Sequence, residues 1–120
     1  MAELFYFRRL TVYQHARQLA LEVNELVKSF PQEERFALSD QVRRASTSVM
    51  FNIAEGFGRY TPHDRVRFLD IANGSAMETA SELELAHEYG YMSSEKLNDL
   101  DGLILGIVKQ LASLRASLIK

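Results

Sequence analysis

The stretch from Leu38 to Tyr60 reads LSDQVRRASTSVMFNIAEGFGRY and decides the fold of this 120-residue chain. On a helix, at about 100° per residue, its apolar residues form an ordinary core-facing stripe: Leu38, Val42, Ala45, Val49 and Ile53. Beside the stripe runs a narrow polar arc whose members are three or four residues apart: Gln41, Arg44, Ser48, Asn52, Glu55 and Arg59. The stretch therefore predicts a helix over 38–58 with an apolar stripe and a polar arc.

The back of this predicted helix is apolar as well. Met50, Phe51, Ala54 and Phe57 occupy directions in which a solvated bundle helix carries Lys and Glu. A helix that is apolar on more than one side buries more than one side. We therefore expect these four residues to form an oligomer interface, in preference to a ligand pocket.

Three further helices are predicted, over about 11–29, 62–89 and 94–118. Pro31 ends the first, and Thr61 followed by Pro62 predicts the start of the third. The last carries apolar residues in three-four alternation, the pattern of a bundle core: Leu97, Leu100, Ile104, Ile107, Leu111, Leu114 and Leu118. Four amphipathic helices with short connections predict one all-α domain over residues 1–120, an antiparallel up-down-up-down four-helix bundle.

Composition narrows the classes of function. The chain has no cysteine, which excludes disulfides and thiolate chemistry. It has no signal-like or membrane-spanning apolar run, so we expect a soluble cytoplasmic protein without membrane contact. The net charge of −2 is not that of an avid nucleic-acid binder, yet residues 35–67 carry six Arg against three acids. One face could therefore still be basic.

The segments QVRRASTSVMFNIAEGFGRY (41–60) and RFLDIANGSAMETASELELAHEYGYMS (67–93) closely resemble the four-helix bundle family encoded within intervening sequences of bacterial 23S ribosomal RNA genes. FRRLTVYQHA and SFPQEERFALSDQ resemble it too, so the similarity covers nearly the whole chain. The family also resembles the accessory variability determinant of diversity-generating retroelements, a more basic bundle that associates with nucleic acid and a reverse transcriptase. The resemblance implies a homopentameric ring with a central channel and no known enzyme. Its NIAEG signature, Asn52 to Gly56 here, has no established chemical role.

Two interpretations of the polar arc remain open. In the first, Gln41, Ser48, Asn52, Glu55 and Arg59 form a hydrogen-bonded network, with Glu55 and Arg59 as an i,i+4 pair. Glu55 would then neutralise Arg44 as well as Arg59 and make both unavailable to phosphate. In the second, the arc lies at a subunit interface or channel lip, where arginines contact phosphate. Five copies of Arg43, Arg44 and Arg59 in a ring would concentrate positive charge, and binding would depend steeply on salt.

Arg65 and Arg67, near Tyr60 and His63, form a second basic group at the start of the predicted third helix. A helix N-terminus could add to an anion site there. The alternative is that Asp64 and Asp70 pair with these arginines along the same helix.

Enzymatic chemistry finds little support in the sequence. Glu84 and His87 have the Glu-x-x-His spacing of di-iron bundles, but the second copy that such a site needs is missing. Ser46, Ser48 and Ser75 have no His at helical spacing, and no phosphate-binding glycine loop follows a strand. We expect no catalytic residue, no metal, no cofactor and no small-molecule substrate.

The leading hypothesis is a non-enzymatic oligomeric accessory or scaffold protein that binds RNA or a nucleoprotein complex. Its contacts would be five arginines: Arg43, Arg44, Arg59, Arg65 and Arg67. The alternative is a protein–protein interaction module that binds no nucleic acid. An enzyme or small-molecule binder that uses the central channel is the least supported reading.

Overall fold

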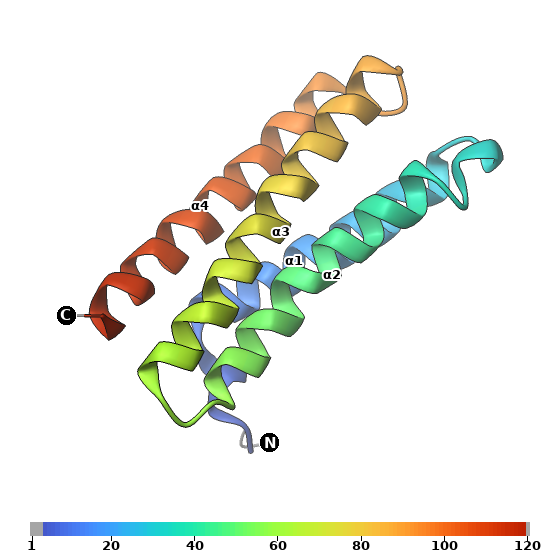
Figure 1. Ribbon diagram of the computed structural model, residues 1–120. Coiled ribbons are helices and arrows are strands. Elements are labelled where there is room, and N and C mark those ends of the chain that lie inside the picture. Colours follow the sequence, from blue (N-terminus) through green and yellow to red (C-terminus); the bar gives the residue numbers. More distant parts are fainter. Residues whose placement is uncertain (1–3, 120) are drawn as a thin grey trace.

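The computed structural model describes residues 4–119, which form four α-helices and three short 3-10 helices without a strand. In chain order these are η1 (Tyr6–Arg9), α1 (Thr11–Leu26), η2 (Val27–Ser29), η3 (Gln32–Glu34), α2 (Leu38–Phe57), α3 (Pro62–Glu88) and α4 (Ser94–Leu118). Figure 1 shows the four long helices lying alongside one another. The all-α prediction is confirmed. Residues 27–29, predicted to end the first helix, continue it as the 3-10 turn η2.

The ends of the helices follow from local sequence. At the start of α3, the Thr61 side chain accepts a hydrogen bond from the backbone N–H of Asp64 at 3.2 Å, and Pro62 takes the first helical position. Ser93 caps α4 in the same way, with a bond of 3.0 Å. Gly90, just beyond α3, has a φ of +84°, a left-handed conformation that glycine adopts without a steric cost.

One core lies between the four helices. Each successive pair of helices is in contact, and α4 also contacts α1, so the helices surround the core. The largest side chains buried in it are aliphatic and come from all four helices: Leu19, Val23, Val42, Val49, Ile53, Leu69, Leu83, Leu100 and Ile107. Burying one such side chain contributes about 1.5–3 kcal/mol, which makes this core the main source of stability. Within residues 4–119, no helix is long and apolar enough to cross a membrane.

Contacts between distant parts of the chain hold one end of the molecule together. Tyr91 follows α3, and its hydroxyl group donates a hydrogen bond of 2.7 Å to Glu34 Oε2 in η3. Because a phenolate would lie beside this carboxylate, the bond raises the pKa of Tyr91 to about 12. Nearby, Lys96 Nζ donates to Glu22 Oε1 at 2.7 Å, and this bond lowers the pKa of Glu22. The connection between α1 and α2 is thereby fastened to the α3–α4 end of the bundle.

Candidate functional site

The centre of the predicted polar arc lies between α2 and α3. Ser48 Oγ is 2.8 Å from Ser75 Oγ on α3, and the Asn52 side-chain amide donates to both the backbone carbonyl of Ser48 (2.8 Å) and its hydroxyl (3.0 Å). These groups are partly buried, so the bonds satisfy polar atoms that would otherwise be costly to bury. Gln41 lies outside this group: it is exposed and makes no hydrogen bond to Ser48, Asn52 or Glu55.

Three of the five arginines predicted to contact RNA lie beside carboxylates. Arg43 lies 3.4 Å and Arg44 3.8 Å from carboxylate oxygens of Asp40, and Arg59 Nη2 lies 3.0 Å from Glu55 Oε1. The expectation that Glu55 also neutralises Arg44 is wrong, because Asp40 lies one turn before Arg44 and takes that role. All three are exposed pairs, which stabilise little and leave the guanidinium groups accessible.

The five arginines form two groups rather than one face. Arg43 and Arg44 lie near the start of α2, whereas Arg59 follows its end. A helix rises about 1.5 Å per residue, so about 22 Å along α2 separates Arg44 from Arg59. Arg65 and Arg67 join Arg59 at the α2–α3 turn, and we call these three residues the arginine cluster.

Aromatic rings hold the arginine cluster in place. The Arg59 guanidinium carbon is 4.4 Å and that of Arg67 5.1 Å from the centre of the Phe68 ring, while Arg65 lies 5.1 Å from the Phe57 ring. Arg65 also donates to the backbone carbonyl of Arg59 at 3.1 Å. The alternative that Arg65 and Arg67 pair with Asp64 and Asp70 is not found among the described residues, and Asp70 pairs with Arg115 instead. These cation–π contacts orient the guanidinium groups and leave their charge in place.

Two atoms of the arginine cluster are buried without a hydrogen-bond partner. They are Nε of Arg59 and Nε of Arg65. Each belongs to a guanidinium that lies against a phenylalanine ring. One terminal nitrogen of each arginine is used within the chain, Nη2 of Arg59 for Glu55 and Nη2 of Arg65 for the backbone carbonyl of Arg59.

The predicted interface residues on the back of α2 differ in burial. Phe51 is 61% exposed. Met50 and Phe57 are half-buried and pack against the core of their own chain, and Ala54 is also half-buried. Of the four residues, Phe51 thus presents the most apolar surface for a contact outside the chain.

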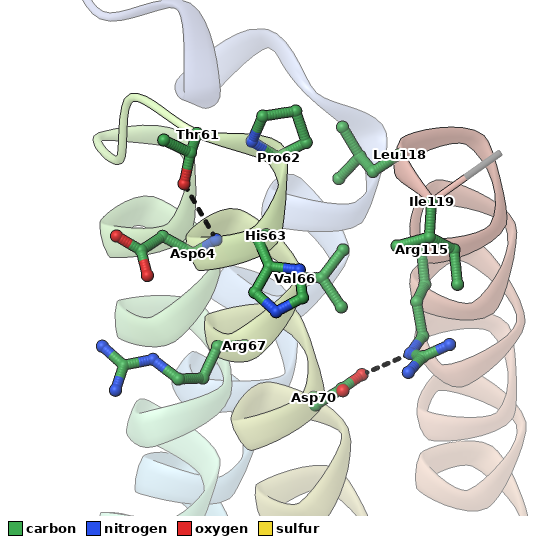
Figure 2. Close-up of a pocket in the computed structure, with 10 residues that line it drawn as sticks. All are labelled: Thr61, Pro62, His63, Asp64, Val66, Arg67, Asp70, Arg115, Leu118 and Ile119. Atoms are coloured by element: carbon green, nitrogen blue, oxygen red, sulfur yellow. Dashed lines mark hydrogen bonds and ion pairs between the residues drawn. The ribbon is translucent and has the colours of Figure 1, made fainter.

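A pocket of about 800 Å³ lies between the start of α3 and the end of α4 (Figure 2). Its walls combine apolar residues with an ion pair between Arg115 Nε and Asp70 Oδ1 at 2.8 Å. Figure 2 shows the Arg67 side chain pointing away from α4, so its charge is not directed at the Arg115 side of the pocket. With Asp64 also in the wall, this pocket has no excess of positive charge for an anion.

The remaining candidate residues have other surroundings. His87, of the Glu-x-x-His spacing, has its Nε2 2.9 Å from the hydroxyl of Ser94. Ser46, which is fully buried, donates to the backbone carbonyl of Arg43 at 3.0 Å. Within residues 4–119, no three side chains of His, Asp or Glu come together as a metal site would require.

Three residues of the site were not identified from the sequence. Asp40 precedes Arg43 and Arg44 by three and four residues, so helical spacing alone could have identified this pair. Ser75 was singled out only as a candidate nucleophile, and no contact between Phe68 and an arginine was predicted. Ser75 meets Ser48 on α2, and Phe68 meets Arg59, which follows α2. Which residues of two helices meet depends on how the helices pack.

Comparisons with known proteins identify a family that the chain matches. Residues 8–113 match the model of a family described as 23S rRNA-intervening sequence protein. A crystal structure of a protein of unknown function from the S23 ribosomal protein family of Bacteroides thetaiotaomicron is similar, with a TM-score of 0.81 and 28% sequence identity. The similarity covers 88% of this chain and 98% of that one. No curated protein matches the chain.

Proposed function

The chain belongs to the 23S rRNA-intervening sequence protein family, and from that membership together with the arginine cluster we propose a non-enzymatic accessory protein that assembles with copies of itself and contacts RNA. The cluster is the observation that carries this proposal. Arg59, Arg65 and Arg67 bring three guanidinium groups to one turn, and Glu55 balances only one of them. An RNA partner would place the protein in the cytoplasm.

The chemistry of the α2–α3 turn suits a single-stranded or looped RNA. Guanidinium groups bind phosphate, and aromatic faces stack on unpaired bases. Tyr60, beside the cluster, is fully exposed and makes no hydrogen bond to another described residue. The cluster and Tyr60 therefore supply the two kinds of contact that such an RNA requires.

Assembly is the second part of the proposal, and it builds on an antiparallel, up-down-up-down order of the helices. Four residues, 58–61, join α2 to α3, and five, 89–93, join α3 to α4. Five extended residues span about 17 Å, less than half the roughly 40 Å length of the 27-residue α3. These two connections are therefore too short to return along a helix, which favours an antiparallel order of α2, α3 and α4.

In the proposed assembly, antiparallel bundles form a pentameric ring through the outer face of α2. Exposed Phe51 lies on this face, and the number five rests on resemblance to the family. A ring would repeat the arginine cluster in every copy. Its combined charge would exceed what the net charge of −2 of one chain suggests.

An RNA titration tests the proposal. A labelled hairpin derived from 23S ribosomal RNA is added to the protein at low and at moderate salt, and binding is measured by fluorescence anisotropy. We expect binding at low salt that weakens steeply as salt rises. Arg67→Gln should weaken binding and lower the salt slope by about one, because one phosphate contact is lost.

Arg17→Gln is the matched control, because Arg17 is exposed on α1 and belongs to neither arginine group. It should bind the hairpin as the unchanged protein does. Absence of binding even at low salt would refute the RNA proposal. Arg59 is a poorer position for this test, because its guanidinium is paired with Glu55 and its replacement would also remove that ion pair.

A protein-interaction module without nucleic acid is the second candidate. The pairing of Arg43, Arg44 and Arg59 with carboxylates favours it, because part of the basic charge is already balanced. Exposed Phe51 would then serve protein contacts alone. This candidate predicts self-association that is unaffected by RNA, together with no binding of the hairpin.

A further inference from the structure

A second pocket, of about 310 Å³, lies where α1 leads into α2. We call it the α1–α2 pocket. Val27, Phe30 and Pro31 form its apolar part, and Phe30 is itself buried, with its ring 5.4 Å from that of Tyr91. The hydrogen bond from Tyr91 to Glu34 joins this region to the segment that follows α3.

The charges around the α1–α2 pocket have one sign. Lys28, Arg35 and Arg43 line it, and no carboxylate is among its nine lining residues. This distinguishes it from the pocket of Figure 2, whose wall includes both Asp64 and Asp70. The three cations that line this cavity of about 310 Å³ repel one another, and an anion bound between them would relieve that repulsion.

Two of these cations make ion pairs that leave them available. Glu25 lies 3.0 Å from Lys28, but both side chains are well exposed, and such pairs are weak. Asp40 lies 3.4 Å from Arg43 and is shared with Arg44, so one charge balances two.

Arg35, the third cation of the lining, and the neighbouring Glu34 each contact other residues. Arg35 makes no ion pair with another described residue, and its guanidinium lies 5.2 Å from the centre of the exposed Phe36 ring. Glu34, although next to Arg35, uses both carboxylate oxygens elsewhere, for the Leu38 backbone N–H at 3.4 Å and for the Tyr91 hydroxyl.

Neutral donors complete the lining. Asn24 and Gln32 carry side-chain amides, and Ser39 in the first turn of α2 carries a hydroxyl. Ser39 is only 6% exposed, and its side chain makes no hydrogen bond to another described residue. Two guanidinium groups, an ammonium, a hydroxyl and two amides offer more donors than the two oxygens of a carboxylate can accept. The three or four oxygens of a phosphate match them better.

We propose that the α1–α2 pocket, through Lys28, Arg35, Arg43 and Ser39, binds a phosphate group. The phosphate belongs either to a small phosphomonoester or to the 5′ end of an RNA strand. Ser39 and Arg59 are separated by about 30 Å along α2, so this pocket and the arginine cluster are different sites. The phosphate site needs no assembly and does not depend on the proposed contact between the cluster and RNA.

Titration of the full chain with inorganic phosphate, followed by amide chemical shifts in nuclear magnetic resonance spectra, tests the site. We expect saturable shifts at Arg35 and Ser39, and no such shifts with chloride at the same ionic strength. Arg35→Gln should weaken phosphate binding about tenfold, the loss expected for one charge-assisted hydrogen bond. Ser39→Ala should weaken it by a smaller factor.

Lys109→Gln is the control, because it removes one positive charge on α4, away from the pocket. Circular dichroism melting curves establish that each variant is folded. Saturable binding that Arg35→Gln weakens and Lys109→Gln does not would support the site. Absence of saturable shifts, or equal losses in both variants, would overturn it.

Two further probes identify the source of the phosphate. Adenosine monophosphate binding at least as tightly as inorganic phosphate would indicate a small phosphomonoester. An RNA dodecamer that binds more tightly with a 5′-phosphate than with a 5′-hydroxyl, and loses this difference in Arg35→Gln, would indicate an RNA end. RNA binding that depends on Arg67 but not on Arg35, with no phosphate binding, would support the arginine cluster and overturn the pocket.

Discussion

Glu82 on α3 has a carboxyl group in an unfavourable environment. Its Oε1 atom is buried and has no hydrogen-bond partner, and Glu78 lies one helical turn before it. Burial, and then the neighbouring carboxyl group of Glu78, raise the pKa of Glu82 to about 7. The folded protein therefore binds a proton at Glu82 more tightly than the unfolded chain does.

The pH dependence of stability follows from this difference. The raised pKa means that the folded state holds more protons than the unfolded state between pH 4.5 and about 7. The free energy of unfolding should therefore fall as pH rises through this range, by on the order of 1 kcal/mol once solvent screening of the partly exposed group is allowed for. Glu82→Gln imitates the protonated carboxyl and should raise the melting temperature at pH 8 more than at pH 5.

Glu84→Gln is the matched control, because Glu84 is exposed on the same helix. Melting curves by circular dichroism at the two pH values give the comparison. Equal effects of both substitutions at pH 8 would show that Glu82 has no special environment.

Single residues also show where sequence reasoning succeeds. Spacings of three and four along one helix identified Ser48 and Asn52 as neighbours, and they form hydrogen bonds. The same spacing placed Gln41 in the group, but it is exposed, because the polar arc extends beyond the part that faces α3. A periodic pattern predicts the direction in which a side chain points from its own helix. The residue that it contacts on a neighbouring helix depends on how that helix is rotated.

Among the elements, α2 and α3 approach each other closely at Gly56. A Cβ atom placed on Gly56 would lie 3.2 Å from Phe68 Cβ and 3.3 Å from the backbone carbonyl oxygen of Arg65. Both atoms are fixed to the backbone of α3, so neither can move away by rotation of a side chain. The glycine of the NIAEG signature therefore has a packing role, which the sequence alone did not reveal.

Substitution of this glycine should separate the two helices. Gly56→Ala should lower the free energy of unfolding by about 1 kcal/mol, because strain at the contact exceeds the gain in helix propensity. Gly102→Ala on α4 should raise it by about 0.5–1 kcal/mol, since nothing lies within 4 Å of the added methyl group. Urea denaturation of both variants measures the difference. A gain in stability for Gly56→Ala would refute the close-packing argument.

Each of the four long helices was recognisable from apolar residues at helical spacing and from Pro and Gly at the ends. The hydroxyl cap at Thr61 agrees with the start that Thr61 and Pro62 predicted for α3, and a second hydroxyl cap, at Ser93, precedes α4. Such signals do not explain the start of α2. Ala37 precedes this helix without a side-chain cap, and the Leu38 backbone N–H donates a hydrogen bond to Glu34 instead. This bond depends on the path of the chain through η3.

At the scale of the molecule, the apolar surface is more widely spread than the sequence of α2 suggested. Large exposed hydrophobic residues occur on all four long helices, for example Leu21, Phe51, Ile71 and Leu105. Met50 and Phe57 are partly covered by their own chain, so the argument for assembly through α2 rests mainly on Phe51. Single exposed apolar side chains are common in proteins. The role of Phe51 must therefore be tested by comparison with another exposed apolar residue of this chain.

Replacement of Phe51 by serine tests the proposed assembly. If Phe51 lies at the centre of a contact between copies, Phe51→Ser should shift the protein to the monomer, because loss of a buried aromatic side chain costs about 3 kcal/mol or more. Leu105→Ser, at a residue of similar exposure on α4, should leave the assembly intact. Light scattering and native mass spectrometry of the unchanged chain and both variants give the oligomeric state, and circular dichroism establishes that each variant is helical. If the unchanged chain is a monomer, or if both substitutions act alike, α2 is not the assembly face, and the arginine cluster must contact RNA with the charge of one chain alone.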